Sequence, residues 1–300
     1  MTSRVAGIEL GGTKGIAVLV RDGAIVDRLR VPTTLPEPTL AALIGQVAAW
    51  HSIEGLDAIG IASFGPLALD PGDPAFGFIT STTKAHWSNT DVRGPFARAF
   101  DIPVGFDTDV GGAALAEGRW GAAQGCSDHI YLTIGTGVGA GIVSGGHLVH
   151  GTRHPEAGHI RVRRVPGDSF AGACPFHGDC LEGLVSGPAL AARTGLPGET
   201  IPSDHPVWVN AAAEIAEAMA FLLITLAPRR IVVGGGVAAG RRVLLADIRA
   251  RTSALIGGYL PGCEREAIEQ IIVPPELGDD AGPLGAAQLG YLALYASKRV

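Results

Sequence analysis

The chain opens with two apolar, β-prone runs joined by a glycine turn. Residues 4–10 and 15–20 flank Gly11-Gly12-Thr13-Lys14, and this pattern predicts a β-hairpin. Helical and strand-like apolar spacings then alternate along the chain, which predicts an α/β domain. The elements expected in this part are helices at 38–50, 92–100 and 110–121 and strands at 57–63 and 103–107.

A second round of the same pattern begins at His129. There YLTIGTGVGAGIVSGG gives an apolar strand, a turn centred on Gly135-Thr136-Gly137 and another apolar strand, which indicates an internal duplication. Residues 145–182 have no regular period and are rich in Gly, Pro, His and Cys, so we expect this stretch to need an external brace. A strand at 230–233 and helices at 208–226, 240–257 and 283–296 complete the list, and we expect the last helix to pack on the first domain.

Composition narrows the classes of function. Hydrophobic residues make up 47% of the 300 residues and charged ones only 17%, which is enough apolar material for two domains with cores. The net charge of −6 and the absence of a long basic run argue against a nucleic-acid partner. The early glycine turn and the lack of a long uninterrupted apolar run predict a cytoplasmic protein without a membrane partner, whose four cysteines are free thiols or metal ligands.

Glycine turns directly after apolar strands are the strongest feature of the sequence. Their backbone N–H groups can approach a phosphate closely because no Cβ stands in the way. One such turn is more often a plain hairpin, but three with polar side chains attached favour a nucleotide held in a cleft between two domains. Neither a P-loop nor a dinucleotide fingerprint is present. The expected nucleotide-binding residues are Gly11, Gly12, Thr13, Lys14, Thr133, Gly135, Thr136, Gly137, Gly234, Gly235 and Gly236.

The segments GIELGGTKG, FDTDVGGAALAEG, LTIGTGVGAGIV, HPEAGH, CPFHGDCLEGL and IVVGGGV resemble the ROK family of sugar kinases and related repressors. Within that family, TTKAHWSNTDV and CPFHGDCLEGL resemble the bacterial fructokinase branch more than the glucokinases. The resemblance implies an α/β protein with the actin-like ATPase fold, in which two ribonuclease-H-like domains close on ATP and sugar across an interdomain cleft. It also implies a homodimer and the ATP-dependent phosphorylation of a hexose, with fructose favoured over glucose or mannose.

The domain limits follow from the same resemblance. Residues 1–115 plus 283–300 are expected to form the N-terminal domain, with the first phosphate loop and the sugar-binding side. Residues 116–282 are expected to form the C-terminal domain, with the second phosphate loop, the adenosine side and a zinc loop. Two other classes stay open: a sugar-sensing regulator that does not phosphorylate, and a zinc-finger-like binder of nucleic acid. The intact Asp109 and phosphate turns count against the regulator, and the acidic charge and the lack of a basic helix after Cys180 count against the nucleic-acid binder.

The catalytic base is expected at the end of the strand at 103–107. Phosphoryl transfer to a hydroxyl needs a carboxylate that orients the hydroxyl and takes its proton, and ligands of open α/β sheets bind at such strand ends. We expect this carboxylate to be Asp109, with Asp107 as the rival, although an aspartate at this junction is equally often a helix cap. The family has an Asn-Asp pair here, so Thr108 departs from the pattern, as does Gly111 where many members carry Asn. The resemblance implies that Thr108 contacts the substrate.

Glu156, His159 and Glu182 complete the sugar site that the resemblance implies, on the strength of HPEAGH and CLEGL. Carboxylates and imidazole recognise hydroxyls in fixed directions. Taken singly, acidic residues in a loop are more often simply solvated. The longer Glu9 stands where many family members carry Asp beside the first phosphate turn, and it is the candidate ligand for the Mg²⁺ that accompanies ATP.

A zinc site is expected in the irregular stretch at 145–182. Cys174, His177 and Cys180 form a Cys-x-x-His-x-x-Cys triplet, and His159 lies upstream, so two thiolates and two imidazoles suit tetrahedral zinc. Four protein ligands leave no position for water, so this zinc would be structural. His154 is the alternative fourth ligand, and the plain interpretation is two unrelated free cysteines with a surface histidine. Cys126 and Cys263 are expected to be buried apolar residues.

Overall fold

The structure is a computed structural model that describes residues 3–239 and 241–298. The chain forms two compact units. The first contains the chain through Gln124, the short segment Leu148–Pro155 and the chain from Leu277 onward, and the second contains Gly125–His147 and Glu156–Glu276. The expected boundary at 115 therefore lies too early. It falls inside the helix Asp109–Trp120, which stays with the first unit because it packs along the C-terminal helix.

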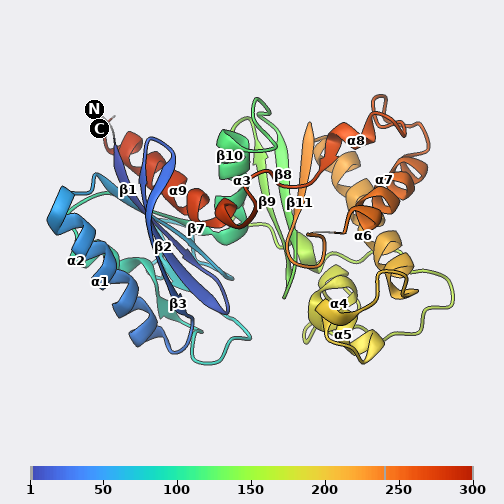
Figure 1. Cartoon of the computed structure of the whole chain (residues 1–300), viewed down its shortest axis with the longest axis horizontal. Coiled ribbons are helices and arrows are strands. Elements are labelled where there is room, and N and C mark those ends of the chain that lie inside the picture. The colour runs from blue at the N-terminus through green and yellow to red at the C-terminus, as the bar shows by residue number, and fades with distance from the viewer. Residues whose placement is uncertain (1–2, 240, 299–300) are drawn as a thin grey trace. The chain divides into compact units, whose positions relative to one another are not determined.

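The first unit is built on a five-stranded sheet of order β3-β2-β1-β4-β7 (Figure 1). Strand β1 pairs antiparallel with β2 and parallel with β4, and β4 pairs parallel with β7, so β1, β4 and β7 all end at one edge of the sheet. The expected hairpin is thus confirmed. The strands of this sheet are β1 (Arg4–Leu10), β2 (Lys14–Arg21), β3 (Ala24–Pro32), β4 (Ala58–Ser63) and β7 (Val104–Thr108).

Helices cover both faces of this sheet. Along β1, Ala6, Ile8 and Leu10 pack with apolar side chains of α1 and α2. On the alternate face, Val5 packs with side chains of α9 and α3. The helices are α1 (Pro36–Glu54), α2 (Arg93–Ala99), α3 (Asp109–Trp120) and α9 (Ala281–Ser297), and a small separate sheet consists of β5 (Phe78–Ile79) and β6 (Thr90–Asp91).

A row of glycines lets α9 lie directly on this sheet. Gly7, Gly60 and Gly105 are partners in register on β1, β4 and β7. A Cβ on Gly7 would lie 2.7 Å from the backbone nitrogen of Ala287, and a Cβ on Gly60 would overlap the carbonyl oxygen of Ala286. The C-terminal helix therefore packs on the first unit, as expected, and it does so at a distance that only glycine strands permit.

The second unit repeats this arrangement with a sheet of order β10-β9-β8-β11-β12. An antiparallel hairpin, β8–β9, again leads into parallel strands, since β8 pairs with β11 and β11 with β12. The matching strand order agrees with the internal duplication expected at His129. The strands are β8 (His129–Ile134), β9 (Val138–Ser144), β10 (His147–Leu148), β11 (Arg230–Gly234) and β12 (Ile272–Val273).

The helix α6 (Val207–Leu226) is the core helix of the second unit. It is long and apolar enough to cross a membrane by length and composition, but 67% of its most apolar window is buried within the unit. It packs on α7 (Arg242–Ile256), whose expected start at residue 240 lies outside the described residues. The shorter helices are η1 (Ala157–His159), α4 (Leu181–Val185), α5 (Gly187–Thr194), η2 (Gly198–Thr200), α8 (Ile268–Ile271) and η3 (Gly278–Asp280), the last of which belongs to the first unit.

Candidate active site

The turn from β7 into α3 holds the candidate catalytic base in the first unit. Thr108 caps the helix, because its Oγ1 accepts the backbone N–H of Gly111 at 3.0 Å. Asp109 is the first residue of α3, and its Oδ1 accepts the N–H of Val110 at 2.9 Å. A threonine rather than an aspartate therefore caps the helix.

Asp107 is engaged within the first unit. It is buried, its Oδ1 accepts the N–H of Thr108 at 2.7 Å, and its Oδ2 lies 2.7 Å from Nε2 of His150. This hydrogen bond to Asp107 raises the pKa of His150 above its ordinary value. Asp109 is only half-buried by comparison. Of the two aspartates, Asp109 is therefore the more exposed one.

Glu9 lies near the same end of the sheet, at the end of β1. Burial raises its pKa to about 7, although Lys14 lowers it, and Asp109 raises it further. Its Oε2 is buried with no hydrogen-bond partner among the described residues. A buried carboxylate oxygen without a partner, beside a glycine turn, suits a cation such as Mg²⁺, whose ligands are oxygens.

The first glycine turn closes the β1–β2 hairpin. The N–H of Gly11 donates to the carbonyl of Lys14 at 3.0 Å, and the carbonyl of Gly11 accepts the hydroxyl of Thr33 at 2.8 Å. Gly12 and Thr13 are exposed at the tip. The pairing of β2, β1, β4 and β7 places the first turn, the candidate metal ligand Glu9 and the candidate base Asp109 at one end of one sheet. Lys14 and Asp109 accordingly shift the pKa of Glu9, the first downward and the second upward.

The other two glycine turns meet within the second unit. The N–H of Gly135 donates to the carbonyl of Gly137 at 2.9 Å, and the carbonyl of Gly135 accepts the N–H of Gly187 at 2.7 Å. Gly235 has φ 85°, and a Cβ there would overlap the carbonyl of Ile134, so only glycine fits. A cavity of about 660 Å³ is lined by Gly135, Thr136, Gly187, Pro188, Ala191, Gly198, Trp208, Gly236, Val237 and Arg241.

The residues that line this cavity include some of the nucleotide-binding residues expected from the sequence and several that were not expected. Gly135, Thr136 and Gly236 line it, whereas Thr133 and Gly234 lie within paired strands of the sheet. Gly137 lies against the Glu182 carboxylate instead. Sequence reasoning missed Pro188, Trp208 and Arg241, which come from three separate elements and carry no common motif.

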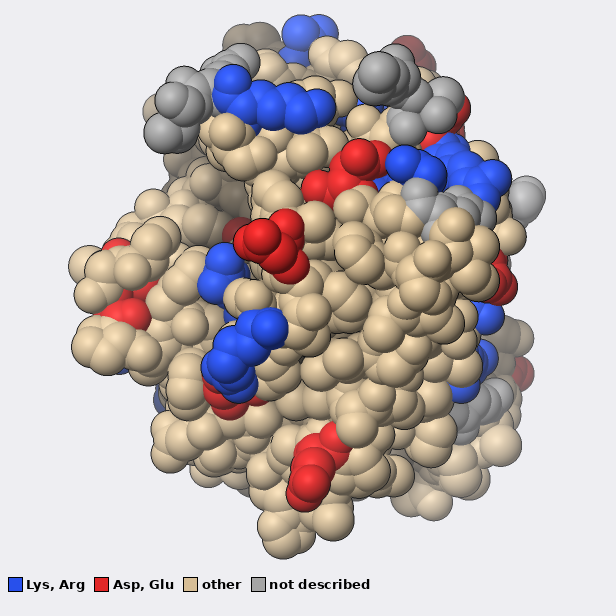
Figure 2. Space-filling view, turned by 90° about the vertical axis from the view of Figure 1, so that its left-hand side faces the viewer, with Lys and Arg blue, Asp and Glu red and all other residues tan. Residues whose placement is uncertain are grey.

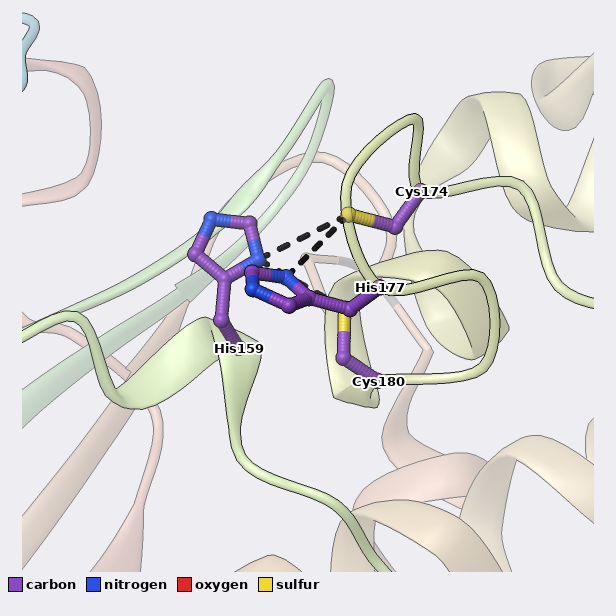
Figure 3. Close-up of side chains that lie close together, drawn as sticks. All are labelled: His159, Cys174, His177 and Cys180. Atoms are coloured by element: carbon purple, nitrogen blue, oxygen red, sulfur yellow. Dashed lines mark hydrogen bonds between the residues drawn. The ribbon is translucent and has the colours of Figure 1, made fainter.

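Four side chains of the irregular stretch converge, as Figure 3 shows. The ligand atoms of His159, Cys174, His177 and Cys180 all lie within 4.8 Å of one another. Nδ1 of His159 lies 3.5 Å from Sγ of Cys180 and 3.7 Å from Sγ of Cys174, and Nδ1 of His177 lies 3.6 Å from Sγ of Cys174. A tetrahedral zinc ion holds neighbouring sulfur and nitrogen ligands about 3.6 Å apart, so these residues fit the metal.

The backbone around this cluster is preorganised. Cys174 and Gly178 exchange backbone hydrogen bonds of 3.1 and 2.9 Å, which forms a tight turn around His177. Burial raises the pKa of the Cys180 thiol to about 11, and Cys174 adds to the shift, so thiolates here need a cation to be stable. His154, the alternative fourth ligand, lies elsewhere: it belongs to the first unit, where its Nε2 accepts the N–H of Leu67 at 2.9 Å.

The two glutamates of the candidate sugar site lie in the second unit. Oε2 of Glu182 accepts the N–H of Val138 at 3.0 Å, directly after the second glycine turn. Burial raises the pKa of Glu156, and the charge of Glu182 raises it further, so the two carboxylates influence each other. His159 donates its backbone N–H to the carbonyl of Glu156 at 3.0 Å. Among the expected residues, His159 thus belongs to the Cys/His cluster, Glu156 accepts its backbone N–H, and Glu182 contacts the end of the second turn.

Two sheets of the same strand order, each beginning with a glycine-turned hairpin, define the class of the actin-like ATPases. The chain matches the model of the ROK family over residues 5–291, and it belongs to that family. It is 42% identical to a fructokinase from Pediococcus pentosaceus over 96% of this chain and 97% of that protein.

Solved structures agree with the family and the fold. The chain is similar to a ROK hexokinase from Thermus thermophilus, with a TM-score of 0.80 and 28% identity over 98% of this chain and 99% of that one. It is also similar to a ROK family glucokinase from Streptomyces griseus, solved in complex with glucose and AMPPNP, with a TM-score of 0.76 and 27% identity over 97% and 100% of the two chains. The predicted α/β, actin-like fold and the predicted family are therefore confirmed.

Proposed function

We propose that this protein is an ATP-dependent hexose kinase that converts D-fructose and ATP into D-fructose 6-phosphate and ADP. The observation that carries the proposal is that the strand register places Glu9 at the end of β1, Lys14 at the start of β2 and Asp109 directly after β7 at one end of the first sheet. There Lys14 lowers the pKa of Glu9 and Asp109 raises it. The similarity to the Pediococcus fructokinase supports fructose as the substrate.

In the proposed reaction Asp109 orients the 6-hydroxyl of the sugar and accepts its proton as the oxygen attacks the γ-phosphorus of ATP. The bond between that phosphorus and the bridging oxygen breaks, and ADP leaves. The N–H groups of the glycine turns and the ammonium of Lys14 offset the charge of the phosphates. Glu9 would hold the Mg²⁺, which neutralises phosphate charge when bound. Thr108, Glu156, His159 and Glu182 would recognise the sugar hydroxyls.

Zinc would play a structural part. The four ligands His159, Cys174, His177 and Cys180 would fill a tetrahedral shell and fix the loop that begins at Glu156 and ends at Glu182. His159 can serve both sites, because its Nδ1 faces the sulfurs while its Nε2 remains for a sugar hydroxyl (Figure 3). The brace expected for the irregular stretch would then also position a sugar-binding group.

The assembly and location are part of the proposal. We expect a cytoplasmic homodimer that binds sugar and ATP and has no nucleic-acid or membrane partner. On the one face that Figure 2 draws, the Lys and Arg among the described residues lie between Asp and Glu rather than in one continuous patch, which supports the charge argument.

A coupled assay of ADP release tests the function. D-fructose, D-glucose and D-mannose are each supplied with MgATP, and kcat/KM is expected to be highest for D-fructose. A higher value for D-glucose would transfer the assignment to a glucokinase. No ADP release above the ATPase background with any of the three sugars would contradict the kinase proposal and favour a regulator that only binds sugar.

A further inference from the structure

Three charged side chains of the second unit are buried against one another. Nη2 of Arg193, on α5, donates to Oδ2 of Asp168 at 2.9 Å and to Oε1 of Glu214, on the core helix α6, at 2.7 Å. The side chains of Arg193, Asp168 and Glu214 are 5%, 9% and 0% exposed. None of the three belongs to the proposed sugar site, to the Cys/His cluster or to the lining of the glycine cavity. The proposed reaction therefore leaves these ion pairs without a role.

The irregular stretch contributes Asp168, and Arg193 holds it in two ways. Besides the ion pair, the guanidinium carbon of Arg193 lies 4.9 Å from the centroid of the Phe170 ring, and the N–H of Phe170 donates to Oδ1 of Asp168 at 3.0 Å. Burial raises the pKa of Asp168, but the N–H of Phe170 and two neighbouring guanidinium groups lower it below its ordinary value on balance. The ionised carboxylate and the ring thus attach residues 168–170 to α5 and, through Arg193, to α6.

Further ion pairs run from Asp168 to the turn that carries the metal ligands. Nη2 of Arg164 lies 3.0 Å from Oδ2 of Asp168, and Nη1 of Arg164 lies 3.7 Å from Oδ2 of Asp179. Asp179 also pairs with Arg161, whose Nη2 donates to the carbonyl of the proposed zinc ligand His177 at 3.3 Å. A continuous chain of charged groups therefore connects the turn of the metal ligands to the core helix of the unit.

This network is better explained by the position it imposes than by stability. Nε and Nη1 of Arg193 and Oε2 of Glu214 are buried with no hydrogen-bond partner among the described residues, so part of their lost hydration is not offset. Apolar side chains of similar volume often hold such places equally well or better. They lack direction, however, whereas a guanidinium and a carboxylate pair only in a narrow range of positions.

We propose that Arg193 is a positioning residue for the sugar site. Through the chain of ion pairs it holds the turn of the metal ligands where their ligand atoms and that of His159 lie within 4.8 Å of one another. The inference rests on the proposed function, in which His159 serves both the metal and a sugar hydroxyl. Without Arg193 the turn would lose its attachment to α5 and α6, so zinc would leave sooner and His159 would hold the sugar less well. Because Arg193 acts through other residues, turnover of bound substrates should not change.

The test follows zinc and activity in the full-length protein, loaded with zinc and freed of excess metal. A chromogenic chelator in excess reports the rate of zinc release. Arg193→Met keeps much of the apolar stem but removes the charge, so zinc release should be about tenfold faster, as for other residues that orient metal ligands. KM for D-fructose should rise severalfold, whereas kcat at saturating D-fructose and MgATP should stay within about twofold of the wild-type value. Arg193→Lys places an ammonium near both carboxylates and should restore most of the wild-type release rate.

A second variant separates position from stability. Arg193→Met leaves Glu214 buried without its cation, which destabilises a protein strongly. Arg193→Met combined with Glu214→Leu removes both charges and leaves Asp168 paired with Arg164. This double variant should unfold close to the wild-type temperature and still release zinc about tenfold faster than the wild type.

The matched control removes an exposed ion pair of the same stretch. Nε of Arg163 lies 4.0 Å from Oε1 of Glu217, on α6, and the Arg163 side chain is 81% exposed. Arg163→Met should therefore leave zinc release and the KM for D-fructose unchanged. Equal acceleration of zinc release in Arg163→Met would overturn the inference, because any charge lost from the stretch would then act alike.

Three other results would also overturn the inference. They are wild-type release rates in both Arg193→Met and the double variant, a wild type that takes up no zinc, and a kcat reduced more than about tenfold with zinc release unchanged, which would place Arg193 in the chemistry. Faster zinc release in variants of a protein that phosphorylates no hexose would support the positioning of the turn by Arg193 and contradict only the proposed function.

Discussion

His150 donates from Nε2 to the Oδ2 of Asp107 over 2.7 Å, two residues before the candidate base Asp109. His150 belongs to Leu148–Pro155, the short segment that joins the first unit between two stretches of the second. A second histidine of the segment, His154, accepts the N–H of Leu67 at 2.9 Å. Two histidines thus fasten this segment to the first unit directly before the chain reaches Glu156.

The hydrogen bond between His150 and Asp107 gives a first prediction, about how the stability of the protein depends on pH. The hydrogen bond to Asp107 raises the pKa of His150, so the folded protein holds the imidazole proton more tightly than the unfolded chain does. The resulting stability is complete below pH about 6.5 and is lost as the pH rises through the pKa of the folded state. Thermal unfolding of the wild type should show this loss as the pH rises above about 6.5. His150→Gln should flatten that part of the curve, and an unchanged slope would show that the pair adds nothing to stability.

The second prediction concerns Asp109. Asp109→Asn keeps the shape of the side chain and the acceptor for the Val110 N–H but removes the base, so kcat should fall by about 100- to 10,000-fold. Unfolding temperature and MgADP affinity should stay close to wild type. Asp107→Asn is the matched control, because it removes a carboxylate that is already bonded to His150 and should reduce kcat far less. A larger loss in Asp107→Asn would make Asp107 the base.

The third prediction concerns the buried carboxylate of Glu9. Its pKa of about 7 in the folded protein, against 4.5 ordinarily, means that folding favours the protonated form. Its stabilising contribution is complete below pH about 4.5 and is lost as the pH rises through 7, which amounts to about 3 kcal/mol. Relative to wild type, Glu9→Gln should therefore gain stability in urea unfolding between pH 5 and pH 8. If instead Glu9 is already ionised at pH 5, the difference in unfolding free energy between the variant and the wild type would be the same at pH 5 and pH 8. That result would contradict the prediction.

A fourth prediction tests the glycine row beneath α9. Gly60→Ala places a Cβ on the carbonyl oxygen of Ala286, in backbone that cannot move aside without lifting the helix. We expect a loss of about 3 kcal/mol or more in the free energy of unfolding, or failure to fold. Gly45→Ala is the control, because no atom lies within 4 Å of a Cβ there and alanine favours the helix. Similar stabilities for the two variants would show that α9 does not press on the sheet.

The sequence predicted those elements whose apolar period is regular and whose partners are close along the chain. Strand β3 was missed because it is an edge strand whose positions are all exposed or half-buried and carry Asp27, Arg28 and Arg30. Helix α5 was missed because Gly187 and Pro188 at its start read as a loop. The expected ends of the first domain were misplaced because packing of α3 on α9 sets them, and the sequence pattern does not reveal that packing.

The candidate site, like the fold, was predicted from the sequence only in part. The glycine turns, the Asp109 position and the Cys/His cluster are local motifs, and the sequence alone indicated them. Trp208 and Arg241 meet only through the packing of α6 beside the third turn, so no spacing connects them. The role of Thr108 as the helix cap likewise needed coordinates, because three neighbouring polar residues could each have capped α3.

The last prediction concerns the proposed zinc. Freshly purified protein should contain about one zinc per chain by mass spectrometry of metals, because four ligand atoms already lie at tetrahedral spacing. Cys180→Ser should lower the zinc content, speed proteolysis between residues 156 and 182 and raise the KM for the sugar, since His159 would lose its anchor at Nδ1. KM for ATP should change little, because none of the four ligands lines the glycine cavity.

Cys126→Ser is the matched control for this zinc experiment, because Cys126 is a free cysteine of the same unit outside the cluster and should leave zinc content and sugar KM unchanged. Chelation of the wild type should reproduce the Cys180→Ser phenotype, and added zinc should reverse it. Purified protein without zinc, or full sugar affinity after the metal is removed, would show that hydrogen bonds such as Cys174–Gly178 hold the loop without a metal.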